Sequence, residues 1–202
     1  MSGKLIALEG LDGAGTTTQT ARLVARLIRA GHAAAATREP SDGTIGRFIR
    51  QALADRSARA LPHGALALLF AADRVDHVAN EVAPEVGAGS VVVSDRYVMS
   101  SLAYQSTDHD MKWVAEINRL APRADLTVFV RVSAKTALAR VSARGGQPDR
   151  FEKLDIQEHV ARQYEQALSW MLEDAQACVS VDGERPPDDV EAAIWAAVSP
   201  VL

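Results

Sequence analysis

The sequence is poor in the features that mark several common classes of protein. It holds one cysteine, Cys178, among 202 residues, so a disulfide within the chain is excluded and a reducing compartment is indicated. The net charge is −4 and the pI is about 5.7, which argues against a broad nucleic-acid-binding surface. Any anion site must therefore be local.

Long apolar runs are also missing. The apolar part of MSGKLIALEG (1–10) is too short for the core of a signal peptide. The stretch LPHGALALLFAADRV (61–75) is interrupted by His, Asp and Arg, so it is not expected to span a membrane. Without repeats or linkers, the chain is expected to form a single domain over residues 1–202, with no membrane association and a cytoplasmic location.

Short apolar runs typical of buried strands are present instead, at 4–9, 32–37, 90–95, 125–132 and, more weakly, 177–182. The second run, HAAAAT, has low strand propensity and is assigned from its position. Helical patterns lie between the runs, at 18–31, 66–83, 155–175 and 186–198. Alternating strands and helices predict an α/β fold with a parallel sheet covered on both faces, and ligands at the carboxyl ends of its strands.

For two of these helices the sequence also predicts an end or a buried face. The segment 18–31 places Ala21, Val24, Ala25 and Ile28 on one apolar stripe and is expected to end at Gly31. The last helix is expected to begin near Pro187, which two aspartates follow.

The stretch GLDGAGTTTQ (10–19) nearly matches the phosphate-binding loop G-x-x-x-x-G-K-[ST]. It follows a predicted strand and opens a predicted helix, as that loop requires. Glycines at 10, 13 and 15 allow backbone N–H groups to turn toward an anion, and the Thr17 hydroxyl suits Mg²⁺. The alternative is a strand-to-helix turn whose glycines serve close packing.

The departure from this pattern is Thr16, which stands where the loop has lysine. Losing one charge-assisted contact costs about 1.5–3 kcal/mol. Losing a preorganised transition-state donor lowers a rate by roughly a hundred- to a thousandfold. Either another cation reaches the phosphates, or the chain is a poor catalyst.

Two segments suggest an acceptor site. Arg38 and Pro40 stand at the carboxyl edge of the second predicted strand, although this segment read alone favours a polar loop before a surface helix. Phe70 and Arg74 share a helix face, which suits a ring that stacks on a base beside a guanidinium for a phosphate or carbonyl. The alternative is a core phenylalanine next to an ion pair between Arg74 and Asp73.

The segment SVVVSDRYVMSSLAYQ (90–105) carries the most information. An apolar strand delivers Asp95, suited to Mg²⁺, and Arg96, suited to a phosphate, to its carboxyl edge. Ser101, Tyr104 and Gln105 then share a helix face and offer groups that read a base or a sugar. The alternative is a salt bridge that caps the strand, followed by a polar helix face.

A further segment, 137–153, starts as a helix and breaks at Gly145, Gly146 and Pro148. Arg140, Arg144 and Arg150 surround the break. A mobile lid carrying arginines at about 143–152 could close over a transferring phosphoryl group, a contribution worth roughly a thousand- to a hundred-thousandfold in rate. The alternative is a solvated helix end.

Taken in order, GLDGAGTTTQ, TREP with GRFIR, LLFAADR, SDRYVMSSLAYQ and RGGQPDRFE resemble the thymidylate kinase family, from about residue 4 to residue 165. The resemblance implies a three-layer phosphate-loop NTPase fold with a five-stranded parallel sheet. It also implies phosphorylation of dTMP to dTDP with ATP and Mg²⁺, a step toward dTTP, by a homodimer. Because DGAG holds no arginine, the chain resembles the bacterial class whose basic residues lie in the lid.

The resemblance also implies roles for individual residues. Phe70 would stack on thymine, and Arg74 would contact the base and the acceptor phosphate. Tyr104 would sense the sugar 2′ position. The implied sets are, for catalysis, Asp12, Asp95, Arg96, Arg144 and Arg150; for ATP phosphates, Gly10, Asp12, Gly13, Ala14, Gly15, Thr16, Thr17 and Thr18; for dTMP, Arg38, Pro40, Arg50, Phe70, Arg74, Arg96, Ser101, Tyr104 and Gln105; and for Mg²⁺, Thr17 and Asp95.

Two other functions stay open at this point. Thr16 alone motivates a non-catalytic or strongly impaired nucleotide-binding module on the same fold. A kinase that acts on another nucleoside monophosphate is the second.

Overall fold

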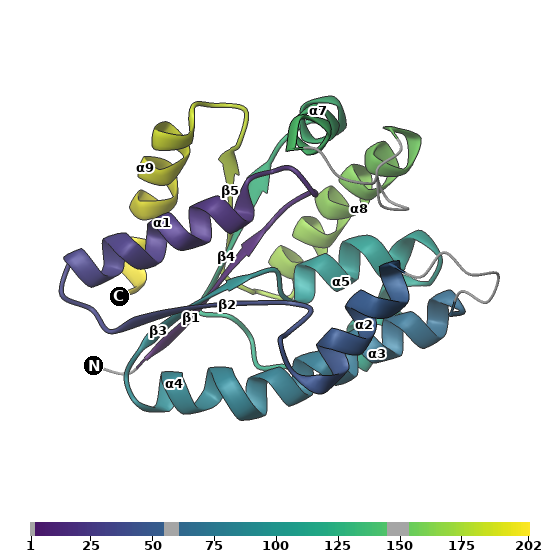
Figure 1. Cartoon of the computed structure of the whole chain (residues 1–202), viewed down its shortest axis with the longest axis horizontal. Coiled ribbons are helices and arrows are strands. Elements are labelled where there is room, and N and C mark those ends of the chain that lie inside the picture. The colour runs from purple at the N-terminus through teal and green to yellow at the C-terminus, as the bar shows by residue number, and fades with distance from the viewer. Residues whose placement is uncertain (1–2, 55–60, 145–153) are drawn as a thin grey trace.

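The computed structural model describes residues 3–54, 61–144 and 154–202, which form a three-layer α/β fold (Figure 1). The described residues contain one sheet of five parallel strands in the order β2-β3-β1-β4-β5. The predicted fold class is therefore confirmed. The strands are β1 (Lys4–Glu9), β2 (Ala34–Arg38), β3 (Val91–Asp95), β4 (Leu126–Arg131) and β5 (Cys178–Asp182).

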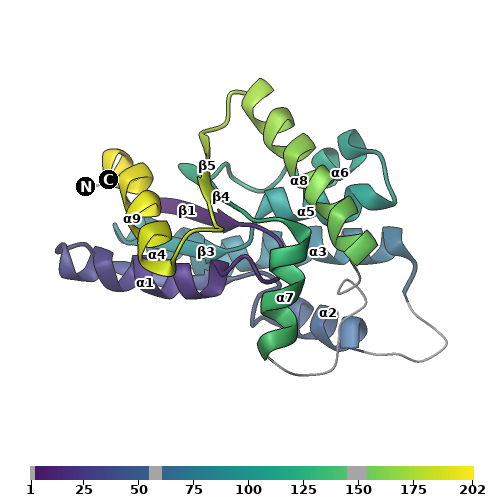
Figure 2. The same ribbon diagram turned by 90° about the horizontal axis from the view of Figure 1, so that it is seen from above.

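Helices cover both faces of the sheet, as Figures 1 and 2 show, with α1 and α9 on one face and α4, α5 and α8 on the other. Helices α2 and α3 lie beyond the carboxyl end of β2 (Figure 1). In the part of the chain that is described, no helix combines the length and the apolar character that a bilayer crossing demands. The helices are α1 (Thr16–Arg29), α2 (Thr44–Ala54), α3 (His63–His77), α4 (Ala83–Gly87), α5 (Val98–Tyr104), α6 (Met111–Ile117), α7 (Ala134–Arg144), α8 (Leu154–Glu173) and α9 (Pro187–Val198).

The helix predicted at 66–83 is continuous but not uniform. It consists of α3, a π-helical turn at Val78–Val82, and α4. The Ala83 N–H donates to the Val78 carbonyl, five residues back. The π turn ends two residues before Pro84, which has no N–H to continue the regular pattern.

The face of α1 that packs on the core differs from the predicted stripe. Leu23 and Leu27 are buried, whereas Ile28 is 56 % exposed and Ala21 is exposed. The two leucines bury more apolar area than the alanines of the predicted stripe, so the helix turns that face toward the sheet. The predicted end is confirmed, since Gly31 follows the helix with φ of 91° and its N–H donates to the Ile28 carbonyl.

The sheet positions a crevice at its carboxyl edge. β1 and β3 are neighbours, but the chain leaves β1 toward β2 and leaves β3 toward β4, so the strand order reverses between them. Ligands bind at such a point in open α/β sheets. Main-chain bonds extend the pairing past the strand ends, from the Arg96 N–H to Leu8 and from the Glu39 N–H to Asp95. Segments distant in sequence thus meet at this edge.

Candidate active site

The loop between β1 and α1 has the backbone of an anion cradle. Gly13 and Gly15 have φ of 94° and 92°, which side chains other than glycine's rarely tolerate. A Cβ atom at Gly13 would lie 2.2 Å from the Ala137 carbonyl oxygen, so α7 packs directly on the loop. Among the described residues, a Cβ atom at Gly15 would meet nothing within 4 Å, and no side chain caps the N-terminus of α1. The first amides of the helix are thus left uncapped, as anion binding at a helix N-terminus requires.

A candidate magnesium site lies beside this loop. The Thr17 hydroxyl donates to Asp95 Oδ2 at 2.5 Å, although the two residues are 78 positions apart. The other oxygen, Asp95 Oδ1, is buried and has no hydrogen-bond partner among the described residues. A buried carboxylate oxygen without a donor costs free energy unless a cation or water meets it. One hydroxyl and one carboxylate suit Mg²⁺, which keeps several waters and is bound through one or two carboxylates together with substrate phosphates.

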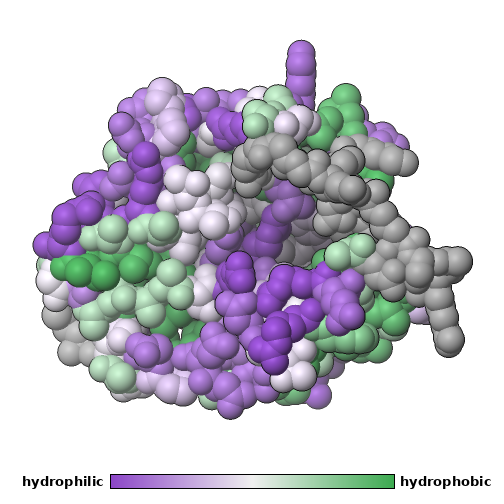
Figure 3. All heavy atoms as spheres, in the orientation of Figure 1, coloured by the Kyte–Doolittle hydropathy of each residue, from purple (hydrophilic) through white to green (hydrophobic). Residues whose placement is uncertain are grey.

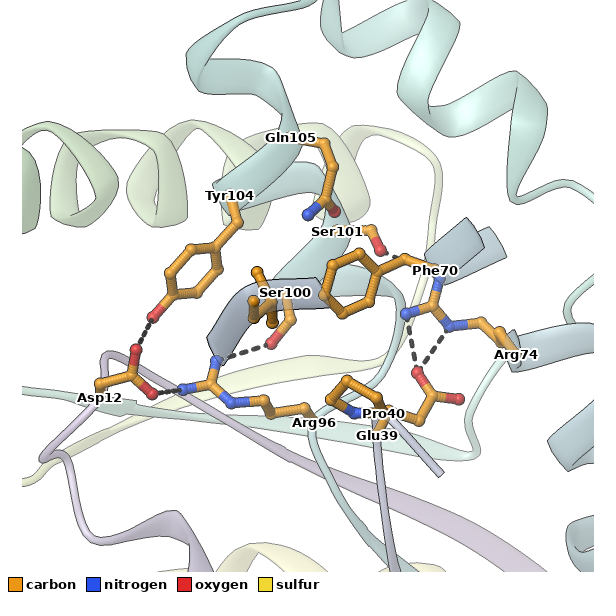
Figure 4. Close-up of a pocket in the computed structure, with 11 residues that line it drawn as sticks. Asp12, Glu39, Pro40, Phe70, Arg74, Arg96, Ser100, Ser101, Tyr104 and Gln105 are labelled. Carbon is orange, nitrogen blue, oxygen red and sulfur yellow. Dashed lines mark hydrogen bonds and ion pairs between the residues drawn. The ribbon is translucent and has the colours of Figure 1, made fainter. Parts of the chain in front are cut away.

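Arg96 is held at the centre of the crevice in a strained backbone conformation, with φ of 74°. Its Nη2 donates to Asp12 Oδ1 at 2.5 Å, and its Nη1 donates to Ser100 Oγ and Tyr164 Oη, both at 3.1 Å. The Tyr104 hydroxyl donates to the other oxygen of Asp12 at 3.0 Å (Figure 4). Asp12 therefore links the loop to the two side chains predicted to meet the acceptor.

A cavity of about 140 Å³ opens beside Arg96, and seven of the nine residues predicted for dTMP line it. Figure 4 shows Phe70, Tyr104 and Gln105 pointing into this space from α3 and from the region of α5. Figure 3 shows a hollow near the middle of this side of the molecule, with hydrophilic residues inside it and along its lower rim. The full lining is Asp12, Glu39, Pro40, Leu53, Phe70, Arg74, Arg96, Ser100, Ser101, Tyr104 and Gln105.

Two lining residues have groups left over for a ligand. Phe70 is only partly buried and turns its ring toward the cavity, which favours the stacking role over the core role. Gln105 Oε1 is buried and accepts no hydrogen bond from the described residues. An apolar plane and an unpaired amide oxygen are what a nucleobase requires of its site.

Arg74 does not form the ion pair with Asp73 that was the alternative interpretation. Asp73 instead accepts bonds from the main chain and hydroxyl of Ser41. Arg74 is 2 % exposed, its N–H groups donate four hydrogen bonds to protein oxygens, and its Nη2 also lies 2.7 Å from Glu39 Oε2 in an ion pair. A ligand that bonds to Arg74 must replace one of them, and the Ser101 hydroxyl, which also lines the cavity, is the most replaceable. The acceptors are Glu39, Ser101, Asn118 and the Tyr97 carbonyl.

Arg38 and Arg50 are not brought into the cavity lining. Both donate to Asp42 Oδ1, and Arg50 also donates to the carbonyls of Pro40 and Ser41. They stabilise the turn between β2 and α2. Their predicted contact with dTMP stays a prediction.

Sequence reasoning missed the buried groups that support the site. Glu9 is fully buried, and its Oε1 accepts from the Tyr97 and Ser100 main-chain N–H groups while its Oε2 accepts from the Ser100 hydroxyl. Burial raises the pKa of the Glu9 carboxyl above its ordinary value of 4.5, although these bonds and Arg96 oppose the rise. An acidic residue inside the apolar run 4–9 was the signal that could have identified it.

The lid is described only at its start. The helical beginning is confirmed, since α7 ends at Arg144, next to the predicted break at Gly145. Arg140 Nη2 donates to the Gly183 carbonyl at 3.0 Å. The rest of the predicted lid, with Arg150, lies outside the described residues, and so does the Arg144 side chain.

Comparison with known proteins identifies the family. The family model for thymidylate kinase matches residues 8–194. The chain belongs to the thymidylate kinase family. The thymidylate kinase of Deinococcus radiodurans is 40 % identical over 204 residues, covering 98 % of this chain and 97 % of the relative. That of Thermomicrobium roseum is 37 % identical, covering 98 % and 95 %, and the probable thymidylate kinase of Pyrococcus horikoshii is 37 % identical over 168 residues, covering 81 % and 82 %.

Membership of the thymidylate kinase family agrees with the resemblance expected from the motifs. It extends the match to the C-terminal region, where the motifs were weak, because the family model runs into α9. It does not remove the question raised by Thr16, which begins α1 and is 6 % exposed.

Proposed function

We propose that this chain transfers the γ-phosphoryl group of ATP to dTMP, forming dTDP for dTTP synthesis. The observation that carries the proposal is the cavity beside Arg96, whose lining includes an aromatic plane, amide and hydroxyl groups, and a guanidinium. This cavity is joined through Asp12 to the loop that suits a triphosphate. Acceptor and donor sites that share a residue suit direct transfer between two bound nucleotides.

The charge that Thr16 does not supply must come from other groups. Phosphoryl transfer spreads negative charge over three equatorial oxygens, and catalysis consists of positioning plus electrostatic stabilisation. Loop amides, Mg²⁺, Arg96 and the lid arginines Arg144 and Arg150 together offer more positive charge than one ammonium. On this basis the enzyme is active without the lysine.

Mg²⁺ fits the pair of Thr17 and Asp95. Thr17 would be a direct ligand, and Asp95 would bind the ion or its waters through the oxygen that lacks a partner. When bound with ATP, the ion neutralises charge on the outer phosphates. The chain itself orients Thr17 by the bond to Asp95.

The test is a coupled assay of purified protein with ATP, Mg²⁺ and a panel of nucleoside monophosphates. We expect turnover that is fastest with dTMP. Preference for another monophosphate would show a kinase with a different acceptor. Turnover no better than that of denatured protein would refute the kinase, and nucleotide binding by calorimetry would then support the non-catalytic module.

The lid arginines have a separate test. Arg144→Ala or Arg150→Ala is expected to slow turnover by at least a hundredfold, since arginines that close on a transferring phosphoryl group contribute roughly a thousandfold or more. Arg29→Ala, at the exposed end of α1, is a matched surface control. Losses of only a few-fold would count against compensation by the lid.

The predicted homodimer has a candidate surface on α3. Leu68, Ala72 and Val75 are exposed and share one face of that helix, and Phe48 on the neighbouring α2 is 48 % exposed. Contiguous exposed apolar side chains are typical of an interface. Leu68→Glu is expected to convert a dimer to a monomer in light scattering, and a wild-type monomer would refute the dimer. The cytoplasmic location and the lack of a nucleic-acid partner stay predictions from composition.

A further inference from the structure

The carboxylate that holds Arg74 uses its two oxygens unequally. Glu39 Oε2 accepts from Arg74 Nε at 2.8 Å and forms an ion pair with Arg74 Nη2 at 2.7 Å. Glu39 Oε1 instead faces the Nδ1 atom of His77 at 3.2 Å. The rotation of the carboxylate about its own axis is therefore set by two partners on opposite sides. Arg74 lines the cavity, whereas His77 is not among the residues that line it.

His77 is the last residue of α3 and is fully buried, without lining the cavity. Its Nε2 lies 2.6 Å from the Thr37 hydroxyl and 3.7 Å from a carboxylate oxygen of Glu81. Thr37 and Glu39 are two residues apart at the end of β2, so they project to the same side of the strand. The His77 imidazole thus connects the end of β2, through Thr37 and Glu39, to α3, the helix that carries Arg74.

The charges around His77 favour a donor at Nδ1. Burial opposes the imidazolium, but the hydrogen bond and charge of Glu39, with the charges of Glu81 and Asp73, outweigh it and raise the pKa of His77 above 6.5. Whichever form predominates, a proton on Nδ1 is fixed by the facing carboxylate. Nε2 then accepts from the Thr37 hydroxyl when the ring is neutral and donates to it when the ring is charged.

We propose that His77 is a positioning residue for the acceptor nucleotide, which fixes Glu39 so that Arg74 faces the cavity in one orientation. The affinity for dTMP then depends on a ring that never touches dTMP. The inference rests on the proposed function, because it concerns the affinity for that acceptor.

A buried carboxylate oxygen has few alternative hydrogen-bond donors within reach. Without a donor from His77, Glu39 Oε1 would be left buried without this partner, a loss that charged groups avoid by rotating or by taking in water. Rotation of the carboxylate weakens the hydrogen bond from Arg74 Nε and the ion-pair contact with Arg74 Nη2. Arg74 then populates other orientations, and dTMP must select the productive one, which lowers its apparent affinity.

A matched pair of substitutions separates the two ring nitrogens. The side-chain amide nitrogen of asparagine is as far from Cβ, counted in bonds, as Nδ1 of histidine. The amide nitrogen of glutamine is as far from Cβ as Nε2 of histidine. His77→Asn therefore keeps a donor toward Glu39, and His77→Gln keeps one toward Thr37. We expect His77→Gln to raise the KM for dTMP by about fivefold, which corresponds to about 1 kcal/mol, with kcat and the KM for ATP within a factor of two. His77→Asn and Thr37→Val are expected to stay within a factor of two of wild type.

A structural role alone predicts a different pattern. In that case the two His77 variants would lower the melting temperature alike and reduce kcat in proportion to the folded fraction. Leu66→Ala, a buried α3 residue outside the network, reports that outcome. Equal KM values for dTMP in the Asn and Gln variants, or a rise shared with ATP, would overturn the proposal. Wild-type protein that neither turns over nor binds dTMP would instead refute the proposed function, and the inference with it.

Discussion

The substitution Phe70→Ala separates the two interpretations of this side chain. If Phe70 stacks on the base, truncation removes about 1–3 kcal/mol of binding free energy, so the Kd for dTMP rises about 5- to 150-fold. The ring is only partly buried in the ligand-free protein. Its loss should cost the fold about 1 kcal/mol, or about 2–4 °C in melting temperature for a chain of this size.

A core phenylalanine would behave in the opposite way. Its truncation costs about 3–5 kcal/mol, or about 6–20 °C, with no selective effect on dTMP. Leu27→Ala is the matched control, since Leu27 is fully buried on α1. Calorimetric titration with dTMP gives the Kd of both variants, and a melting curve gives their melting temperatures. An unchanged Kd for dTMP in a Phe70→Ala protein that melts much lower would refute the stacking role.

Two further predictions concern charge at the site. Asp95→Asn is expected to raise the Mg²⁺ concentration needed for half-maximal turnover and to lower kcat by roughly a hundredfold or more; a magnesium titration with an unchanged midpoint would contradict it. Glu9→Gln keeps acceptors for Tyr97 and Ser100 but removes a charge whose pKa is raised in the folded state. Below the unfolded pKa of about 4.5, Glu9 is protonated in both states and its ionisation does not reduce the free energy of unfolding. As the pH rises from 4.5 to the higher folded pKa, this free energy falls, and above the folded pKa the loss is constant. The variant should therefore gain stability over wild type between pH 4 and pH 8, by on the order of 1 kcal/mol; a difference that shrinks with pH would contradict this sign.

Much of the fold was predictable because strand runs and helix patterns are local properties. The carboxyl-edge rule also brought Thr17 and Asp95 together across 78 positions, since Asp95 ends β3 and Thr17 lies after the end of the adjacent parallel strand β1. The same rule placed Arg96 near the loop.

What could not be predicted depends on packing between distant helices. Nothing local indicates that Arg74 bonds to Asn118, 44 residues away, or that Glu39 rather than Asp73 is its ionic partner. The prediction of the buried face of α1 was wrong for a local reason. Two neighbouring stripes of that helix are both apolar, and the stripe with Leu23 and Leu27 buries more apolar area than the predicted stripe with its two alanines.

The central claim is that loop amides, Mg²⁺ and arginines perform the electrostatic work of the missing lysine. It is tested most directly by measuring kcat of wild type and Thr16→Lys side by side, with saturating ATP, Mg²⁺ and dTMP. The account predicts clear wild-type turnover and a gain from lysine smaller than the roughly hundred- to thousandfold that a transition-state donor supplies when nothing replaces it. Wild-type protein without turnover, converted to an active kinase by Thr16→Lys alone, would contradict the account.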